Sequence, residues 1–331
     1  MEKLFHSLFC ICAILCVAAC RYGTDAVQPD VLSQDISALI ADSERDVQSQ
    51  RFDSAMEKAL SALDLSRKSD YALGEVRALS TVVGIDIMTS RDADAWEKAL
   101  EAESKARSGG FGKELAGILI SKAKLCSYAE ISPETGRNDE GLTYAQEALA
   151  LAEELDAVEQ QAEACYVIGS LYINKNRWLD PIDRELYRQA GEWIGRGQTL
   201  AEANDIPRLK RNGIMFRSRW YQQGDRDEEA IRYFEQVQDS LDETDYLTAS
   251  ALDDRLVRLY TRVGEPQKAL ESHDDYVFRM QKYILQKQDE TLQEMETRFD
   301  LQEKERQLER RRYQVLLLVL ALVLSALAIL L

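Results

Sequence analysis

Residues able to carry out catalysis are scarce in this sequence. Only two histidines occur: His6 lies in the apolar opening segment and His273 stands alone. Asp and Glu are abundant, but no pair is marked out by an apolar setting or a nearby histidine, and no metal-ligand spacing or phosphate-binding loop is present. The glycine-rich run 109–112 falls between two expected helices and indicates a turn. We therefore expect no enzymatic activity and no cofactor or metal, and we interpret His273 as a structural residue.

The cysteines divide between the start of the chain and its body. Four of the six lie in the first twenty residues, and only Cys126 and Cys165 remain in the body. These two could pair in an oxidising compartment, or they could be buried as small apolar residues. The sequence favours burial.

Composition favours helices and argues against nucleic acid as a partner. Ala, Leu, Glu, Gln and Arg dominate the 331 residues, while Gly and Pro are sparse. The formal net charge is −17. A phosphate backbone would therefore be repelled over most of the surface.

The opening segment has the three parts of a secretory leader. Lys3 is followed by an apolar stretch and then by small residues, so we predict a signal peptide over 1–19 and a linker over 20–29. The run 17–20, Val-Ala-Ala-Cys, resembles a bacterial lipobox. That resemblance implies lipidation of Cys20; the alternative is ordinary leader cleavage.

The closing segment predicts a transmembrane helix over 313–331. Every residue from Val315 to Leu331 is apolar except Ser325, and 19 helical residues at ~1.5 Å each nearly span a hydrocarbon core of about 30 Å. With an exported body, Arg310, Arg311 and Arg312 would lie outside, against the positive-inside tendency. A cytoplasmic body with a tail anchor would satisfy that tendency. The leader favours export to the bacterial envelope, with the body periplasmic and anchored in the inner membrane.

A local pattern of small residues at spacings of four and three recurs every 39 to 49 residues. These spacings place three residues on one helical face, where small side chains let a neighbouring helix pack closely. The pattern therefore predicts an all-α array of about six helical hairpins over 30–280. Its members are Ala55-Ala59-Ala62, Ala95-Ala99-Ala102, Gly141-Ala145-Ala148, Ala190-Ile194-Gly197, Ala230-Phe234-Val237 and Ala269-His273-Tyr276.

Helices expected just before these segments carry further signals. Ile168-Gly169 followed by Tyr172, and Leu256-Val257 followed by Tyr260 and Gly264, combine a small-residue contact with an aromatic plug. On these residues the chain resembles the tetratricopeptide repeat (TPR) family. The resemblance implies a solenoid whose first helices line a concave, ligand-binding side.

Beyond the array, 281–312 lacks Gly and Pro and alternates in charge, which predicts a helical stalk. Leu285, Leu292 and Phe299 repeat every seven residues around Met295, which suggests a coiled-coil seam and a homodimer through 285–299. An array followed by a charged helix and a span resembles the sensory half of bacterial membrane-bound TPR regulators. That resemblance implies a role in signal transduction.

The predicted partner-binding groove uses polar and basic side chains of the fourth to sixth hairpins. Arg side chains there could bind carboxylates of an extended, partly anionic peptide or glycan. Alternatively, these arginines pair with Asp253, Glu228, Glu229 or Asp239 of neighbouring helices. The candidate residues are Tyr166, Asn174, Asn212, Met215, Arg219, Gln223, Asp254, Arg258 and Arg262.

The sequence thus predicts a non-catalytic, membrane-anchored module that binds a protein or peptide. Two function classes remain open: a sensory module of a transmembrane regulator, and a structural envelope scaffold without a signalling role. A cytoplasmic tail-anchored adaptor is a third alternative.

Overall fold

The computed structural model describes residues 29–128, 137–177 and 179–330, and every regular element in these ranges is an α-helix. The predicted signal peptide, the lipidation site at Cys20 and all of the predicted linker except Pro29 lie outside them. The helices follow in chain order as α2 (Pro29–Gln48), α3 (Phe52–Lys68), α4 (Ala72–Met88), α5 (Asp92–Gly109), α6 (Gly112–Tyr128), α7 (Asn138–Glu154), α8 (Val158–Asn176), α9 (Arg184–Ala203), α10 (Pro207–Gln223), α11 (Asp227–Ser240), α12 (Tyr246–Val263) and α13 (Pro266–Leu330).

Most helices end in the same tight turn. Gln50, Asp70, Ser90 and Gly110 each have a positive φ, between 54° and 69°, and they lie twenty residues apart. At each turn the next amide closes a bond to the carbonyl five residues back, as Arg51 N–H does to Asp46 O at 2.8 Å. This left-handed cap satisfies the last carbonyls of one helix and starts the next within a few residues.

The predicted small-residue faces are buried as expected in the second helices of the hairpins. Ala55, Ala59 and Ala62 of α3 are fully buried, as are the equivalent alanines of α5. The prediction for His273 is wrong, because its side chain is 56 % exposed and only Ala269 of that triad is buried. The other described triads pack as predicted in α7 and α9, and α11 buries Ala230 and Phe234.

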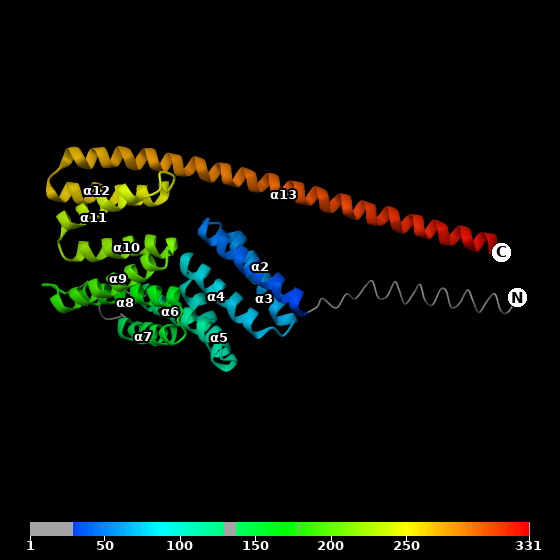
Figure 1. Ribbon diagram of the computed structural model, residues 1–331, viewed down its shortest axis with the longest axis horizontal. Helices are drawn as coiled ribbons and strands as arrows, with labels where there is room; N and C mark the ends of the chain where they lie inside the picture. The colour runs from blue at the N-terminus through cyan, green and yellow to red at the C-terminus, as the bar shows by residue number, and fades with distance from the viewer. Residues whose placement is uncertain (1–28, 129–136, 178, 331) are drawn as a thin grey trace. The chain divides into compact units, whose positions relative to one another are not determined.

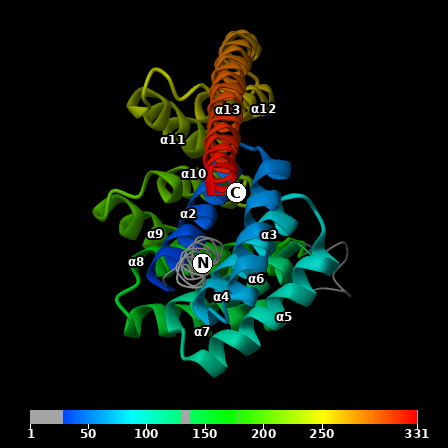
Figure 2. The same ribbon diagram turned by 90° about the vertical axis from the view of Figure 1, so that its right-hand side faces the viewer.

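The chain divides into two compact units, Met1–Gly224 and Asp225–Leu331. In the first unit the hairpins stack in chain order (Figures 1 and 2). The even-numbered helices α2, α4, α6, α8 and α10 contact one another successively, while α3, α5, α7 and α9 pack mainly on the even-numbered helices beside them. The even-numbered helices therefore form the inner row of a curved stack, as first helices do in helical repeat arrays.

Glycines let α8, α9 and α10 approach closely. A Cβ on Gly169 would lie 2.7 Å from Ile194 Cγ1 and 3.1 Å from the Ala190 carbonyl oxygen. Gly197 and Gly213 similarly leave room for the Tyr166 ring and hydroxyl. The predicted small-residue contact at Gly169 is confirmed.

The second unit joins α11, α12 and the start of α13. The Asp253 carboxylate of α12 is 1 % exposed; it accepts hydrogen bonds from Gln238 Nε2 at 2.5 Å and from Arg279 at 2.8 and 2.9 Å. Tyr260 Oη donates to Glu235 Oε1 at 2.5 Å. These contacts tie α11 and α13 to the same face of α12.

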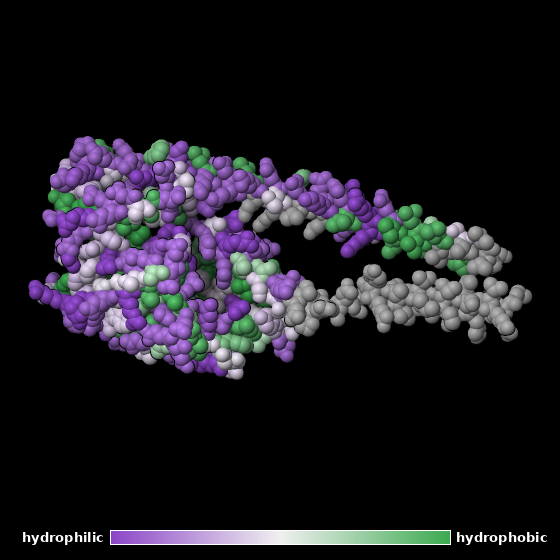
Figure 3. Space-filling model, in the orientation of Figure 1, coloured by the Kyte–Doolittle hydropathy of each residue, from purple (hydrophilic) through white to green (hydrophobic). Residues whose placement is uncertain are grey.

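Helix α13 continues without interruption from the last hairpin through the predicted stalk to Leu330. Figure 3 shows a hydrophobic block on its later part after a hydrophilic stretch, and Val315, Leu318 and Leu322 are more than half exposed. Within the described residues, none of the helices combines the length and the apolarity that a membrane span requires. Within the predicted span, Leu331 and the side chains of 323, 326 and 328–330 lie outside the description.

Cys126 and Cys165 are free thiols, and both are buried, as the sequence favoured. Burial raises the pKa of each thiol to about 11. Both therefore remain protonated at neutral pH and pack as small apolar side chains.

Candidate functional site

The candidate site is the face of the first unit formed by α2, α4, α6, α8 and α10, called here the inner face. Helical spacing places one row of residues on each helix. On α4 the row includes Arg77 and Gly84; on α6 it includes Glu114, Gly117 and Lys124. The rows of α8 and α10 continue it, with Glu159, Glu163, Ser170 and Asn174 on α8 and Arg208, Asn212, Met215 and Arg219 on α10.

Ion pairs connect α4 to α6, α6 to α8 and α8 to α10. Arg77 Nε of α4 lies 2.8 Å from Glu114 Oε1 of α6, and Lys124 Nζ of α6 lies 2.5 Å from Glu163 Oε1 of α8. Arg208 of α10 reaches Glu159 at 2.7 Å and Glu163 at 3.6 Å. Charges of both signs therefore alternate across the inner face.

Among the ion-paired carboxylates of the inner face, Glu163 has the most strongly stabilised charge. Burial raises the pKa of its carboxyl, but Lys124 and Arg208 outweigh burial and lower it to about 2. The carboxylate is thus ionised at any physiological pH, because two cations from neighbouring helices hold it.

Glu44 of α2 differs from the other carboxylates of the inner face. Burial raises the pKa of its carboxyl and the charge of Glu159 raises it further, while Arg208 and Arg77 act in the opposite direction. These influences come from α4, α8 and α10, so α2 lies within electrostatic range of helices that follow it by more than a hundred residues.

Two glycines leave bare backbone between these charges. A Cβ added to Gly84 or Gly117 would meet no atom within 4 Å. Glycine inside a helix costs about 1 kcal/mol relative to alanine, and packing does not require it at these two positions. The space above them can admit a ligand chain close to the helix backbone.

The structure brings together three of the predicted groove residues on α8 and α10: Asn174, Arg219 and Gln223. Arg219 donates from Nη2 to Asn174 Oδ1 and from Nη1 to Ser170 Oγ, each at 3.0 Å. Asn174 Nδ2 in turn donates to Ser127 of α6, 2.8 Å to Oγ. Gln223 Nε2 donates to the Ile173 carbonyl at 2.7 Å, and Tyr166 lies on the same helix as Asn174. A polar network therefore crosses three inner helices.

Tyr166 and Asn174 do not present free surface to a ligand. Tyr166 is 1 % exposed and stacks on Phe216 with ring centroids 5.2 Å apart, and Asn174 is 3 % exposed. Tyr166 therefore fills the space that glycines of α9 and α10 leave, and Asn174 holds Arg219 in position. Asn212 is half-buried and Met215 is 40 % exposed, so these two predicted residues remain accessible.

The other predicted residues belong to the second unit. Arg258 pairs with Asp254 at 2.8 Å one turn away, and Arg262 pairs with Asp227 of α11 at 2.5 Å. Asp253, the suggested partner for a groove arginine, instead pairs with Arg279. Arg258 and Arg262 therefore form ion pairs, as the alternative interpretation predicted, but their partners are Asp254 and Asp227 and not the carboxylates suggested from the sequence.

The sequence prediction missed the inner-face residues of the first three hairpins. Glu44, Arg77, Glu114 and Lys124 stood among many charges, and no motif marked them. Gly84 and Gly117 were the available signal, because glycine inside an otherwise strong helix pattern calls for an explanation.

No protein-family model matches the chain, and no curated protein matches it. Among solved structures, it is similar to the Rap conjugation gene regulator of the plasmid pLS20 in complex with the Phr* peptide, with 16 % identity, a TM-score of 0.54, and coverage of 82 % of this chain and 67 % of that one. It is also similar to a Rap protein complexed with competence and sporulation factor, with 16 % identity, a TM-score of 0.53, and coverage of 78 % and 67 %. A third similar structure is aspartyl phosphate phosphatase F from Bacillus subtilis, with 15 % identity, a TM-score of 0.51, and coverage of 75 % and 60 %.

At these identities the comparisons concern the fold. Together with the stacked hairpins and their inner row of first helices, they assign this chain to the TPR-like helical repeat fold.

Proposed function

We propose that the first unit is a non-catalytic receptor that binds an extended peptide, or an extended segment of a protein, along its inner face. The observation that carries this proposal is the pair of helical glycines, Gly84 and Gly117, with open space above each. Their placement on neighbouring inner helices beside Arg77, Glu114 and Lys124 provides bare backbone and both signs of charge. An extended chain can pack on the bare backbone while its polar groups meet the charges.

The solved neighbours support a peptide as the ligand. Two structures of this fold are described as complexes with the Phr* peptide and with competence and sporulation factor. One neighbour is described as a phosphatase. The inner face of this chain offers ion-paired side chains and bare helix backbone, which suit the binding of a ligand. We therefore propose recognition without catalysis for this chain.

Within this function, Asn212, Met215 and Arg219 contact the ligand, and Asn174 orients Arg219 through the 3.0 Å bond. Arg258 and Arg262 of the second unit are engaged in ion pairs and would bind ligand only by exchanging those partners.

The decisive experiment measures binding with a defined probe. The purified chain is panned against a random decapeptide library, and the affinity of a selected peptide is followed by fluorescence anisotropy. Gly117→Gln should weaken that affinity at least about tenfold, because its side chain fills the open space. Gly195→Gln on α9 is the control and should bind normally, because its Cβ would meet only Arg217 Nη2, at 3.7 Å, and lies outside the inner row.

A second substitution separates binding from folding. Gly117→Ala should raise helix stability by roughly 0.5–1 kcal/mol, because alanine is the better helix former and meets no neighbour. Stabilised protein with weaker peptide binding supports the proposal. Equal binding by wild type and Gly117→Gln, or no peptide selected by wild type, refutes it.

We further propose that the chain resides in the bacterial cell envelope, with its repeat body outside the inner membrane, as the sensory part of a transmembrane regulator. The support is the predicted secretory leader over 1–19 with its lipobox-like end at Cys20, the apolar block at the end of α13, and the uninterrupted helix that links this block to the last hairpin. Protease digestion of the body in spheroplasts but not in intact cells, with palmitate labelling of Cys20, tests this location. Digestion only after lysis would instead support a cytoplasmic adaptor.

A further inference from the structure

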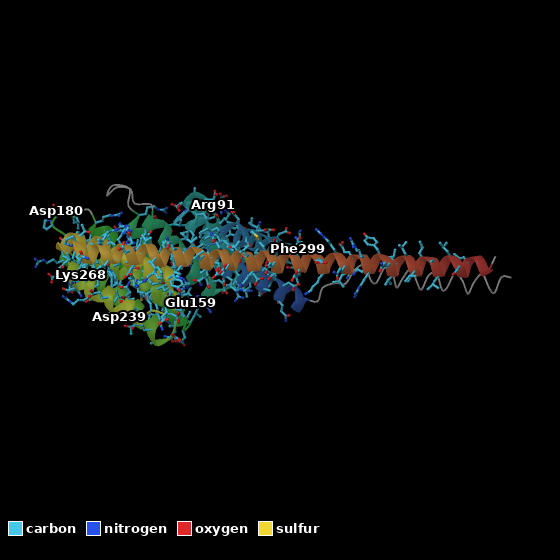
Figure 4. The ribbon with its side chains drawn as sticks, turned by 90° about the horizontal axis from the view of Figure 1, so that it is seen from above. Arg91, Glu159, Asp180, Asp239, Lys268 and Phe299 are labelled. Atoms are coloured by element: carbon cyan, nitrogen blue, oxygen red, sulfur yellow. The ribbon has the colours of Figure 1, made fainter. Side chains whose placement is uncertain are left out.

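An apolar stripe runs along the exposed side of α13. Phe278, Leu285, Leu292 and Phe299 recur every seven residues, and each is between 55 % and 64 % exposed. Figure 4 shows α13 from the side, with Phe299 labelled. Residues seven apart lie on nearly the same side of a helix, so these four form one continuous row.

A second row lies three residues further along, at Gln281, Gln288, Met295 and Gln302, and all four side chains are exposed. The two rows together occupy the two core positions of a heptad repeat. None of the eight is charged, although charged residues are frequent at the other positions between 278 and 302. This absence of charge is confined to one face of the helix.

Charged residues bound the seam at both ends. The two preceding core positions are Glu271 and Asp274, and the two following ones are Arg306 and Glu309. In a pair of identical helices, each of these would face a like charge. The uncharged seam therefore has a defined length of 25 residues, Phe278 to Gln302.

We propose that a second copy of this chain covers the seam, so that two α13 helices form a parallel, in-register coiled coil over residues 278–302. In that register each core residue meets its own equivalent: Phe on Phe, Leu on Leu, Met on Met. Glutamine is self-complementary, because its amide both donates and accepts hydrogen bonds. The amide layers at 281, 288 and 302 therefore pair across the interface.

The antiparallel arrangement of the same helices is less favourable. It would place Gln281 against Phe299 and Gln288 against Leu292, so buried amides would face apolar side chains without hydrogen-bond partners. The order of residues along the seam thus selects the parallel register.

Sedimentation equilibrium of the full chain in detergent tests the pairing. Wild type is expected to be a dimer, and Leu285→Asp with Leu292→Asp should weaken dimerisation by about 100-fold or more, since each introduces a like-charge pair into the core. Thr297→Asp is the control, which adds one negative charge on the opposite side of the helix, and it should remain dimeric. Circular dichroism checks that the exposed substitutions leave the helical content unchanged.

Cysteine cross-linking tests the register, in a background in which the natural cysteines are replaced by alanine. Gln288→Cys should form an inter-chain disulfide under mild oxidation, whereas Thr297→Cys should not, because only core positions approach their equivalents in a parallel pair. A monomeric wild type, an unchanged mass for the double aspartate variant, or equal cross-linking at 288 and 297 would each overturn the proposal. Because the seam lies in the second unit, these results are independent of peptide binding by the first unit.

Discussion

Replacing Asp46 by asparagine should destabilise the first hairpin and remove a specific acid sensitivity. The Asp46 carboxylate at the end of α2 is 2 % exposed and accepts hydrogen bonds at 2.6 Å from Arg51, Ser54 and Lys58. Burial raises the pKa of this carboxyl, but the bonds from Lys58, Ser54 and Arg51 outweigh burial and lower it to about 2. The group thus joins the end of α2 to the start of α3.

The magnitude follows from the difference in pKa between the unfolded and folded chain. A fall from 3.8 to about 2 corresponds to at most about 2.4 kcal/mol, at ~1.36 kcal/mol per pH unit. The Arg51 and Lys58 side chains retain 29 % and 30 % exposure, so solvent screening reduces this to about 1–1.5 kcal/mol. Because the folded pKa is the lower one, this stability is present above pH 4 and is lost as the pH falls from about 4 to about 2.

Amide hydrogen exchange of α3 at pH 7 measures the effect locally, and Asp46→Asn should speed exchange by roughly 5- to 12-fold. Circular dichroism between pH 5 and 2 should show a smaller loss of stability in the variant than in wild type. Asp64→Asn is the matched control, because Asp64 pairs with Lys68 at an exposed site, and its effect should stay below about 0.5 kcal/mol. Equal effects of the two substitutions would refute the reasoning.

Three further substitutions test other parts of the fold. Gln50→Gly should stabilise the chain by roughly 0.5–1 kcal/mol in denaturant unfolding, because Gln50 has φ of 59°, and Gly110→Ala should destabilise it, because φ is 69° there. Burial raises the pKa of Asp253 to about 6 despite Arg279, so the stability of the second unit should increase as the pH falls from about 6 to 4. NMR titration of the Asp253 carboxyl should show a midpoint near 6, and a midpoint below 4 would contradict this. Gly169→Ala should lower the melting temperature by a net cost of about 1–2 kcal/mol, because its methyl group would crowd the Ala190 carbonyl; an unchanged melting temperature would show that α8 and α9 can separate without cost.

The hairpin array was predictable because its signal is repeated. Small residues such as Ala95 and Ala99 recur at one helical spacing, and helix packing requires small residues there. Turn positions were less predictable, since Gln50 and Ser90 adopt the left-handed conformation that the sequence assigns to glycine. At these turns the amide of the following residue donates a hydrogen bond to the carbonyl five residues earlier, and this bond sets the left-handed conformation whatever the residue type.

The candidate site was predictable only in part. Position on the helix identified Asn212, Met215 and Arg219 as inner-face residues, because register depends on spacing alone. Exposure could not be read from spacing: Tyr166 has the same register and is buried, because glycines of two other helices make room for it. Electrostatic influences between helices far apart in sequence, such as that of Glu159 on the pKa of Glu44, depend on how several hairpins stack, which no single hairpin encodes.

The continuity of α13 has a mechanical consequence. Its first turns are packed on α12 by contacts such as Arg279 with Asp253, and the same helix runs on to Leu330 without a glycine or a proline after Pro266. The part of α13 beyond position 283 has about 47 residues and is therefore roughly 70 Å long. A tilt of only about 5° at the last hairpin would displace the far end of this helix by about 6 Å. A small change in the angle between α12 and α13 would therefore displace the C-terminal end of α13 by more than the pitch of an α-helix.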